Sequence, residues 1–283
     1  MEEEGDVDDR KSIENSLKKL KLCGIDCQYN NNEFKLNNIA QDKRTNNFKI
    51  PKFVTKLNER CLGECWWIRE VELPKDLEQI DESAFDDYLN LTGINFGKNI
   101  RVLGKSCFAY SGLKKVNLPE SLITIEKYAF SFCKSMEQVK FGNRLESIGN
   151  KAFYNNRLKE INIPDSVRYI DEEAFAYCHD LKQVKIGKNV KKIGDGAFQS
   201  SGLTEICLPD SVEVLGNAVF HSCGNLEKVE IGIGRGLKSI GVRVLDQCNN
   251  LKRVYIPSTY QGENRELLIK GLDIRDHVQI VEV

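Results

Sequence analysis

The sequence predicts a right-handed, curved solenoid of about ten stacked turns of 22–23 residues, with a parallel sheet on its concave face. Two regularities support this prediction. Prolines recur every 45 residues from Pro74 to Pro209, and glycines fall midway between them. Seven of the thirteen phenylalanines are also spaced by 22 or 23 residues, namely Phe85, Phe108, Phe130, Phe153, Phe175, Phe198 and Phe220. A unit this short cannot bury a core alone, so successive turns must stack.

Residues 158–181 illustrate one turn of the solenoid. The segment 161–163, Ile-Asn-Ile, alternates apolar and polar residues, which is the pattern of a short strand. Pro164 then turns the chain, because proline fixes φ and donates no backbone hydrogen bond. Residues 171–178 place their alanine and cysteine on one face and predict a short helical or 3-10 turn. Equivalent strands are expected near residues 48, 71, 94, 116, 139, 161, 184, 206, 229 and 254.

The ends of the chain depart from the repeat, and both are expected to act as caps. Residues 1–11 are acidic and are predicted to be a disordered tail. Residues 12–47 begin with an amphipathic helix, from 12 to 22, and are predicted to be the N-terminal cap. The solenoid spans 48–260, and 261–283 is predicted to be a C-terminal cap with a closing strand. Caps are needed because an open terminal turn exposes apolar side chains and unpaired strand edges.

Composition excludes several classes of function. The chain has 41 Lys+Arg and 42 Asp+Glu, so no broad basic surface for nucleic acid is expected. No apolar run reaches the roughly 18 residues that cross a bilayer, so we expect no membrane insertion. The acidic start lacks the apolar segment of a secretory signal. We therefore expect a cytoplasmic protein; display at the cell surface, or secretion by a non-standard route, is the alternative.

Most of the ten cysteines occupy core positions of the repeat: Cys61, Cys65, Cys107, Cys133, Cys178, Cys223 and Cys248. A buried free cysteine behaves as a small hydrophobic residue, and the chain contains no C-x-x-C zinc motif. We expect structural thiols in a reducing compartment, with a metal site or a disulfide as alternatives. Only Cys223 and Cys248 lie on adjacent turns. Cys207 differs, because it is expected to face outward from a strand.

No motif predicts catalysis. His179 and His221 occupy different repeat positions and are expected in surface loops. The chain has no Gly-x-Ser-x-Gly and no His-Glu-x-x-His motif. We therefore predict that the protein is not an enzyme and has no catalytic, cofactor-binding or metal-binding residues. An enzyme built on Cys207 is a third and weaker hypothesis.

The unit Leu-x-x-Ile-x-Ile-Pro-x-Ser-Val-x-x-Ile-x-x-x-Ala-Phe-x-x-Cys-x-x-Leu at 158–181 resembles the BspA-type leucine-rich repeats, and the resemblance extends from residue 48 to about 260. It implies a leucine-rich repeat solenoid of the α/β class, mostly β. Members of this family look like surface adhesins and interaction modules. We accordingly expect a monomeric, non-catalytic protein–protein interaction scaffold or recognition module. The alternative is a cell-surface or secreted adhesion module that binds host or matrix protein or glycan.

Candidate partner-binding residues form two sets. The first lies on the predicted concave face, which is polar and mixed in charge: Glu70, Glu72, Lys115, Asn117, Lys140, Glu160, Asn162, Lys185, Glu205, Lys228, Glu230, Arg253 and Tyr255. The second is aromatic and is expected on or near the outer face: Trp66, Trp67, Tyr110, Phe132 and Tyr177. For the tryptophans, packing against the N-terminal cap is the alternative. Tryptophan, tyrosine and arginine dominate protein-binding hot spots, so the aromatic set is of particular interest.

Overall fold

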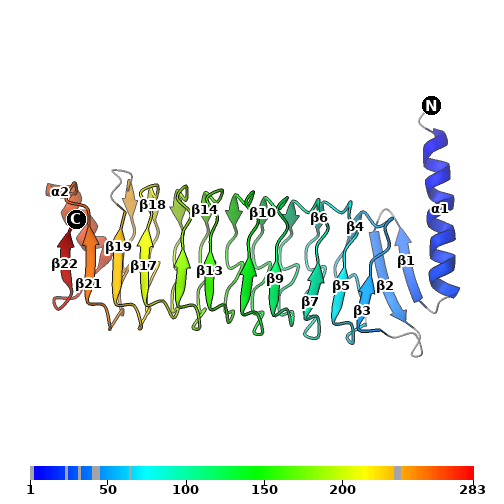
Figure 1. Ribbon diagram of the computed structural model, residues 1–283, viewed down its shortest axis with the longest axis horizontal. Helices are drawn as coiled ribbons and strands as arrows, with labels where there is room; N and C mark the ends of the chain where they lie inside the picture. The colour runs from blue at the N-terminus through cyan, green and yellow to red at the C-terminus, as the bar shows by residue number, and fades with distance from the viewer. Residues whose placement is uncertain (1–2, 23–24, 31–32, 40–44, 64, 233–236) are drawn as a thin grey trace.

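A computed structural model describes residues 3–22, 25–30, 33–39, 45–63, 65–232 and 237–283. It shows an elongated stack of parallel turns (Figure 1). Each turn contributes one long strand to the same face, and these strands are β3 (Asn47–Lys49), β5 (Glu70–Glu72), β7 (Gly93–Asn95), β9 (Lys115–Asn117), β11 (Gln138–Lys140), β13 (Glu160–Asn162), β15 (Gln183–Lys185), β17 (Glu205–Leu208), β19 (Lys228–Ile231) and β21 (Arg253–Ile256). The predicted solenoid is confirmed, with each strand within a residue of its expected start.

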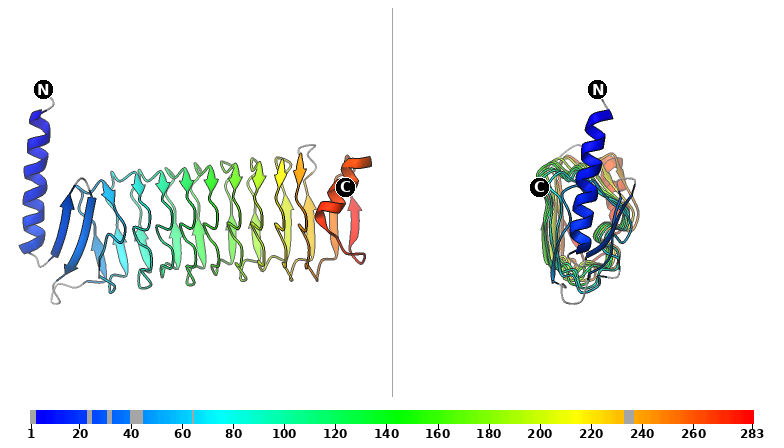
Figure 2. Two further views of the ribbon diagram at one scale, coloured as in Figure 1. Left: turned by 180° about the vertical axis from the view of Figure 1, so that it is seen from behind. Right: turned by 90° about the vertical axis from the view of Figure 1, so that its right-hand side faces the viewer.

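A second row of two-residue strands was not predicted. It consists of β4 (Lys56–Leu57), β6 (Gln79–Ile80), β8 (Val102–Leu103), β10 (Thr124–Ile125), β12 (Ser147–Ile148), β14 (Tyr169–Ile170), β16 (Lys192–Ile193), β18 (Val214–Leu215) and β20 (Ser239–Ile240). From β6 to β20 these strands pair into one eight-stranded parallel sheet. The turns superimpose in the end-on view, and the stack is a nearly straight column, so the predicted curvature is slight (Figure 2).

The column is held together by repeated contacts between equivalent residues. Val116 of β9 pairs with Val139 of β11, and Ile161 of β13 pairs with Val184 of β15. Between the two rows of strands the seven repeated phenylalanines are fully buried. Their rings stack on one another from Phe85 to Phe220, with centroids 5.1–5.8 Å apart and planes within 14° of parallel. The core is therefore one continuous stack that is renewed in every turn.

The segment predicted as a short helical turn forms hydrogen-bonded turns without regular helix. In residues 171–178 the backbone N–H of Ala174 donates to the carbonyl of Asp171 at 3.3 Å, as a 3-10 turn requires. The next N–H, that of Phe175, instead donates to Ala197 on the following turn at 2.8 Å. Glu173 and Tyr177 have left-handed φ values of 52° and 60°. Bonding between turns therefore replaces the continuous local bonding that a helix needs.

The alternation of proline and glycine has a steric cause. Gly187 lies directly against Pro164 of the preceding turn, so closely that a Cβ atom on it would be 2.2 Å from the proline carbonyl oxygen. Gly97 and Gly142 lie against Pro74 and Pro119 in the same way. Glycine therefore permits the close approach of one turn to the next at this edge.

The N-terminal end is covered by a hairpin and a helix. Strands β1 (Ile25–Asn30) and β2 (Glu33–Ile39) pair antiparallel, and β2 joins β4. Helix α1 (Glu3–Leu22) stands beside β1 (Figure 1). It begins nine residues before the predicted start at residue 12, so the prediction of a disordered tail over residues 1–11 is wrong for most of that segment. Extending an existing helix is easier than nucleating one, which is consistent with its length.

At the C-terminal end, helix α2 (Gly262–Leu272) and strand β22 (Gln279–Glu282) follow the last turn. Strand β22 pairs in parallel with β21 and so closes the row of long strands. Helix α2 lies instead at the end of the short-strand row, against β20. The two rows thus end in different ways.

Candidate functional site

The core cysteines have a structural role that the repeat makes visible. The thiols of Cys133, Cys178, Cys223 and Cys248 donate to the backbone carbonyls of Phe108, Phe153, Phe198 and Phe220 at 3.1–3.2 Å. In the turn where asparagine replaces cysteine, the amide of Asn156 donates to the carbonyl of Phe130 at 3.1 Å. The position therefore requires a small side chain that supplies a hydrogen bond to a buried carbonyl.

Burial makes these thiols unreactive. It raises the pKa of Cys133 and of Cys178 to about 12. The thiolate is the nucleophilic form, and it is scarce when the pKa lies so far above the solution pH. The nine cysteines within the described residues are free, and of these Cys207 is exposed.

Alkylation should therefore separate the thiols. We expect iodoacetamide at pH 8 to modify Cys207 in the native protein, while Cys133 and Cys178 react only after denaturant is added. Peptide mass spectrometry of samples quenched over time measures each site. A Cys207→Ser variant should lose the native-state modification at this site. Comparable rates at Cys133 and Cys207 in native protein would contradict the burial of the core thiols.

The first set of candidate binding residues lies on the long strands, and their outward side chains form what we call the long-strand face. Within it, the ammonium of Lys228 lies 3.4 Å from the Glu230 carboxylate and 4.9 Å from the centre of the Tyr255 ring. Lys49 and Glu72 also form an ion pair. A shallow depression of about 450 Å³ crosses β13 to β19. The face is thus polar, open and partly neutralised by its own ion pairs.

The second set is drawn together into a stack. Tyr110 and Phe132 are 4.8 Å apart and parallel within 3°. Tyr154, which the sequence analysis did not include, lies 5.3 Å from Phe132 and 5.2 Å from Tyr177. We call these four residues the aromatic row. Tyr110 is 47% exposed, and the other three are half-buried. The row crosses four consecutive turns at the turns that follow the short strands.

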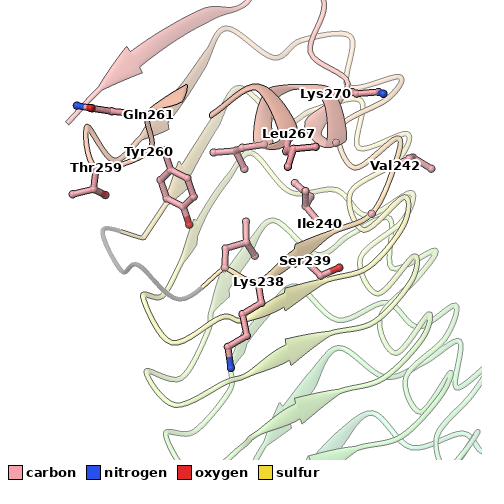
Figure 3. Close-up of a pocket in the computed structure, with 13 residues that line it drawn as sticks. Lys238, Ser239, Ile240, Val242, Thr259, Tyr260, Gln261, Leu267 and Lys270 are labelled. Carbon is pink, nitrogen blue, oxygen red and sulfur yellow. The ribbon is translucent and has the colours of Figure 1, made fainter. Parts of the chain in front are cut away.

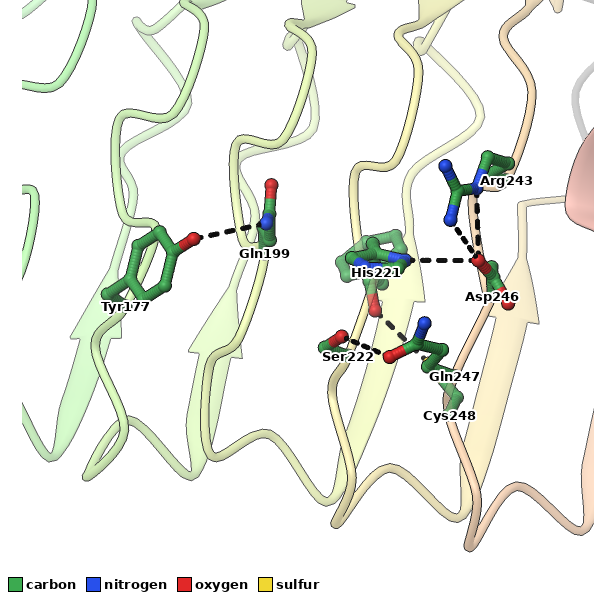
Figure 4. Close-up of polar contacts among 9 residues, drawn as sticks. Tyr177, Gln199, His221, Ser222, Arg243, Asp246, Gln247 and Cys248 are labelled. Carbon is green, nitrogen blue, oxygen red and sulfur yellow. Dashed lines mark hydrogen bonds and ion pairs between the residues drawn. The ribbon is translucent and has the colours of Figure 1, made fainter.

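Polar side chains continue the aromatic row toward the C-terminus. The Gln199 amide donates to the Tyr177 hydroxyl at 3.4 Å, on the next turn (Figure 4). Beyond it, His221 Nδ1 lies 3.3 Å from a carboxylate oxygen of Asp246, which also accepts two hydrogen bonds from Arg243. The prediction that His221 is a surface loop residue is wrong, because only 16% of its side chain is exposed. His179 is exposed, as predicted.

The two tryptophans behave differently from each other. Trp66 is 66% exposed, whereas Trp67 is half-buried and packs against the core. Their rings meet edge to face at 6.0 Å. Trp66 borders a hollow of about 520 Å³ together with Leu89, which is 68% exposed. Packing therefore accounts for Trp67, and Trp66 extends the exposed apolar surface at the N-terminal end.

Neither chemistry nor a membrane anchor emerges from the described part of the chain. Within it, no group of three histidine, cysteine or acidic residues is arranged to hold a metal ion. Neither α1 nor α2 is long and apolar enough to cross a bilayer. No hydrogen bond, ion pair or ring contact among the described residues joins the aromatic row to the long-strand face. The two sets are separate surfaces.

Comparison with known proteins agrees with this architecture. The sequence profile of the BspA type leucine rich repeat region matches residues 33–157 and 146–265, in six copies. A leucine-rich repeat protein from Bacteroides ovatus has a similar structure, with 21% identity, a TM-score of 0.62, and coverage of 92% of this chain and 77% of that one. A leucine rich cell surface protein from Faecalibacterium prausnitzii is 18% identical, with a TM-score of 0.44 and coverage of 92% and 93%.

The pneumococcal vaccine antigen PcpA also matches, with 16% identity, a TM-score of 0.40 and coverage of 92% of each chain. A comparison with curated proteins finds no significant match. The Bacteroides ovatus structure shows a shared fold, and the repeat profile covers well over half of the sequence. This chain therefore belongs to the BspA type leucine-rich repeat family.

Proposed function

We propose that this chain is a non-catalytic binding protein and that its partner, another protein, docks on the aromatic row. The observation that carries this proposal is the unbroken stack from Tyr110 to Tyr177, which keeps aromatic edges at the surface over four turns. Aromatic residues are enriched at protein interfaces because they bury large areas and lose little conformational freedom. The stack is already ordered, so binding would not have to immobilise these side chains.

Charge beside the row indicates the chemistry of the partner. The Lys127 ammonium lies 4.9 Å from the centre of the Tyr128 ring, and that of Lys134 lies 6.0 Å from Phe132. Neither lysine forms an ion pair with a carboxylate among the described residues. A partner that presents carboxylates next to apolar side chains would complement both the rings and the lysines.

A protein partner fits the row better than a glycan does. A sugar ring stacks on an exposed aromatic face, but the faces in this row cover one another, with Tyr110 and Phe132 parallel within 3°. What remains exposed is ring edges and tyrosine hydroxyls, which suit apolar contacts and hydrogen bonds with side chains. The adhesion module that binds matrix protein or glycan is the alternative function.

The test compares two surfaces of the same protein. The row variant carries Tyr110→Ser, Phe132→Ser and Tyr177→Ser, and the matched variant of the long-strand face carries Lys115→Ser, Lys140→Ser and Lys185→Ser. Each is immobilised with wild type and exposed to the proteome of the source cell, and captured proteins are quantified by mass spectrometry. We expect a partner whose affinity falls at least tenfold for the row variant and less than twofold for the other.

Thermal unfolding followed by circular dichroism checks that both variants fold. A glycan array provides a second arm. A partner that is retained by the row variant and lost by the long-strand variant would contradict the proposal. Specific glycan binding without any captured protein would favour the adhesion module instead.

A further inference from the structure

The sheet of short strands ends with an open edge at β20. In earlier turns the last carbonyl of each short strand accepts a bond from the following turn: Gly216 N–H donates to Ile193 at 2.9 Å, and Gly241 N–H donates to Leu215 at 2.8 Å. The equivalent carbonyl in β20 belongs to Ile240, and it accepts no backbone hydrogen bond from the described residues. The register repeats from turn to turn, so this carbonyl points away from β18. Unpaired strand edges are sites where another chain can add a strand.

A hollow of about 810 Å³ lies over this edge, between β20 and helix α2 (Figure 3). The helix is attached through its C-terminal end, where Val244 N–H donates to the carbonyl of Gly271 at 3.2 Å. Further along the helix the hollow stays open, and Leu267 on its wall is 60% exposed. The half-buried side chains of Ile240 and Tyr260 complete an apolar lining. The hollow is within the range of about 300–1,000 Å³ that is typical of ligand sites.

The charges at the rim are of one sign. Lys238 and Lys270 border the hollow, and none of its lining residues is acidic (Figure 3). Lys238 is neutralised by Glu213, whose carboxylate is 2.7 Å away. Lys270 pairs with no carboxylate among the described residues. An occupant with a negative charge near Lys270 would therefore be favoured.

We infer that β20 is a docking site for an extended segment of a partner protein, which adds a strand to the short-strand sheet. The partner's backbone amide donates to the Ile240 carbonyl, one apolar side chain enters between Tyr260 and Leu267, and an acidic side chain lies beside Lys270. Main-chain bonds supply affinity in this mode of recognition, and the pocket for an alternate side chain supplies specificity. This site is independent of the aromatic row.

The test uses a phage-displayed library of random heptapeptides as the probe, selected on the full-length protein and counter-selected on a Leu267→Glu variant. We expect enriched peptides that combine an apolar residue with an aspartate or glutamate. Synthetic fluorescein-labelled copies should bind wild type at least tenfold more tightly than Leu267→Glu by fluorescence anisotropy. A Leu89→Glu variant, which alters an equally exposed leucine elsewhere, should bind like wild type.

Two further measurements address the mechanism. Methylating single backbone nitrogens of the peptide should reduce affinity at least tenfold at some positions and leave the alternate positions unaffected, because only alternate amides face a paired strand. Exchanging the acidic residue of the peptide for lysine should restore affinity for a Lys270→Glu variant. The inference is overturned if no peptide is enriched, if every methylation is tolerated, or if the hollow proves to mediate self-association that Leu267→Glu abolishes.

Discussion

Replacing Phe153 with alanine is expected to lower the free energy of unfolding by about 3–5 kcal/mol. Its ring is fully buried and stacks between Phe130 at 5.2 Å and Phe175 at 5.3 Å, so the substitution opens a cavity at the centre of the column. Each turn of a solenoid contacts only its neighbours, and so the change weakens both of the interfaces that this turn makes. No adjacent element can move in to compensate.

Chemical denaturation followed by circular dichroism measures this loss. Tyr110→Ala is the matched control, because that ring also stacks on a neighbour but is 47% exposed. It should cost about 1 kcal/mol or less. A similar loss for both variants would show that stacking alone, and not burial, determines the contribution of these rings.

Replacing Gly202 with alanine should destabilise the protein by about 2–3 kcal/mol, although it adds only one methyl group. A Cβ atom at this position would lie 2.1 Å from the carbonyl oxygen of His179 on the preceding turn. The Gly202 N–H donates to the carbonyl of Cys178 at 3.2 Å, so moving the turns apart would also strain this bond. The cost therefore arises from the spacing between turns.

Gly224→Ala is the control for this experiment, because no atom lies within 4 Å of a Cβ placed there. With no clash, the variant should match or slightly exceed wild type in stability, since alanine restricts the unfolded chain. Thermal melts of the two variants side by side distinguish them. Equal stability of the two variants would mean that the close approach at Gly202 is readily relieved.

The sequence predicted the features that recur in every turn. The long strands, the buried phenylalanines and the core cysteines all follow from a period of 22 or 23 residues, because a stacked repeat must place equivalent residues at equivalent depths. The short strands were missed because two residues are too few to show an alternating pattern. The hairpin of β1 and β2 was missed because it lies outside the repeat, in an asparagine-rich segment with weak patterning.

The candidate site was predicted only in part, for a related reason. Tyr110, Phe132 and Tyr177 share one repeat position, and so their sequence spacing revealed them. Tyr154 lies one residue earlier in its turn, and only the reach of its side chain brings its ring into the row. The ion pair between His221 and Asp246 joins residues at different repeat positions. Contacts that depend on side-chain direction rather than on period are visible only in three dimensions.

The placement of the tryptophans has a spectroscopic consequence. Trp66 and Trp67 are the two tryptophans of the chain, and both lie in one turn near the N-terminal end. Their fluorescence therefore reports on that end, while circular dichroism averages over the whole column. In a protein whose turns contact only their neighbours, the two signals would diverge if unfolding proceeds from one end and coincide if the column unfolds as a unit. The molecule thus carries its own reporter of where its disassembly starts.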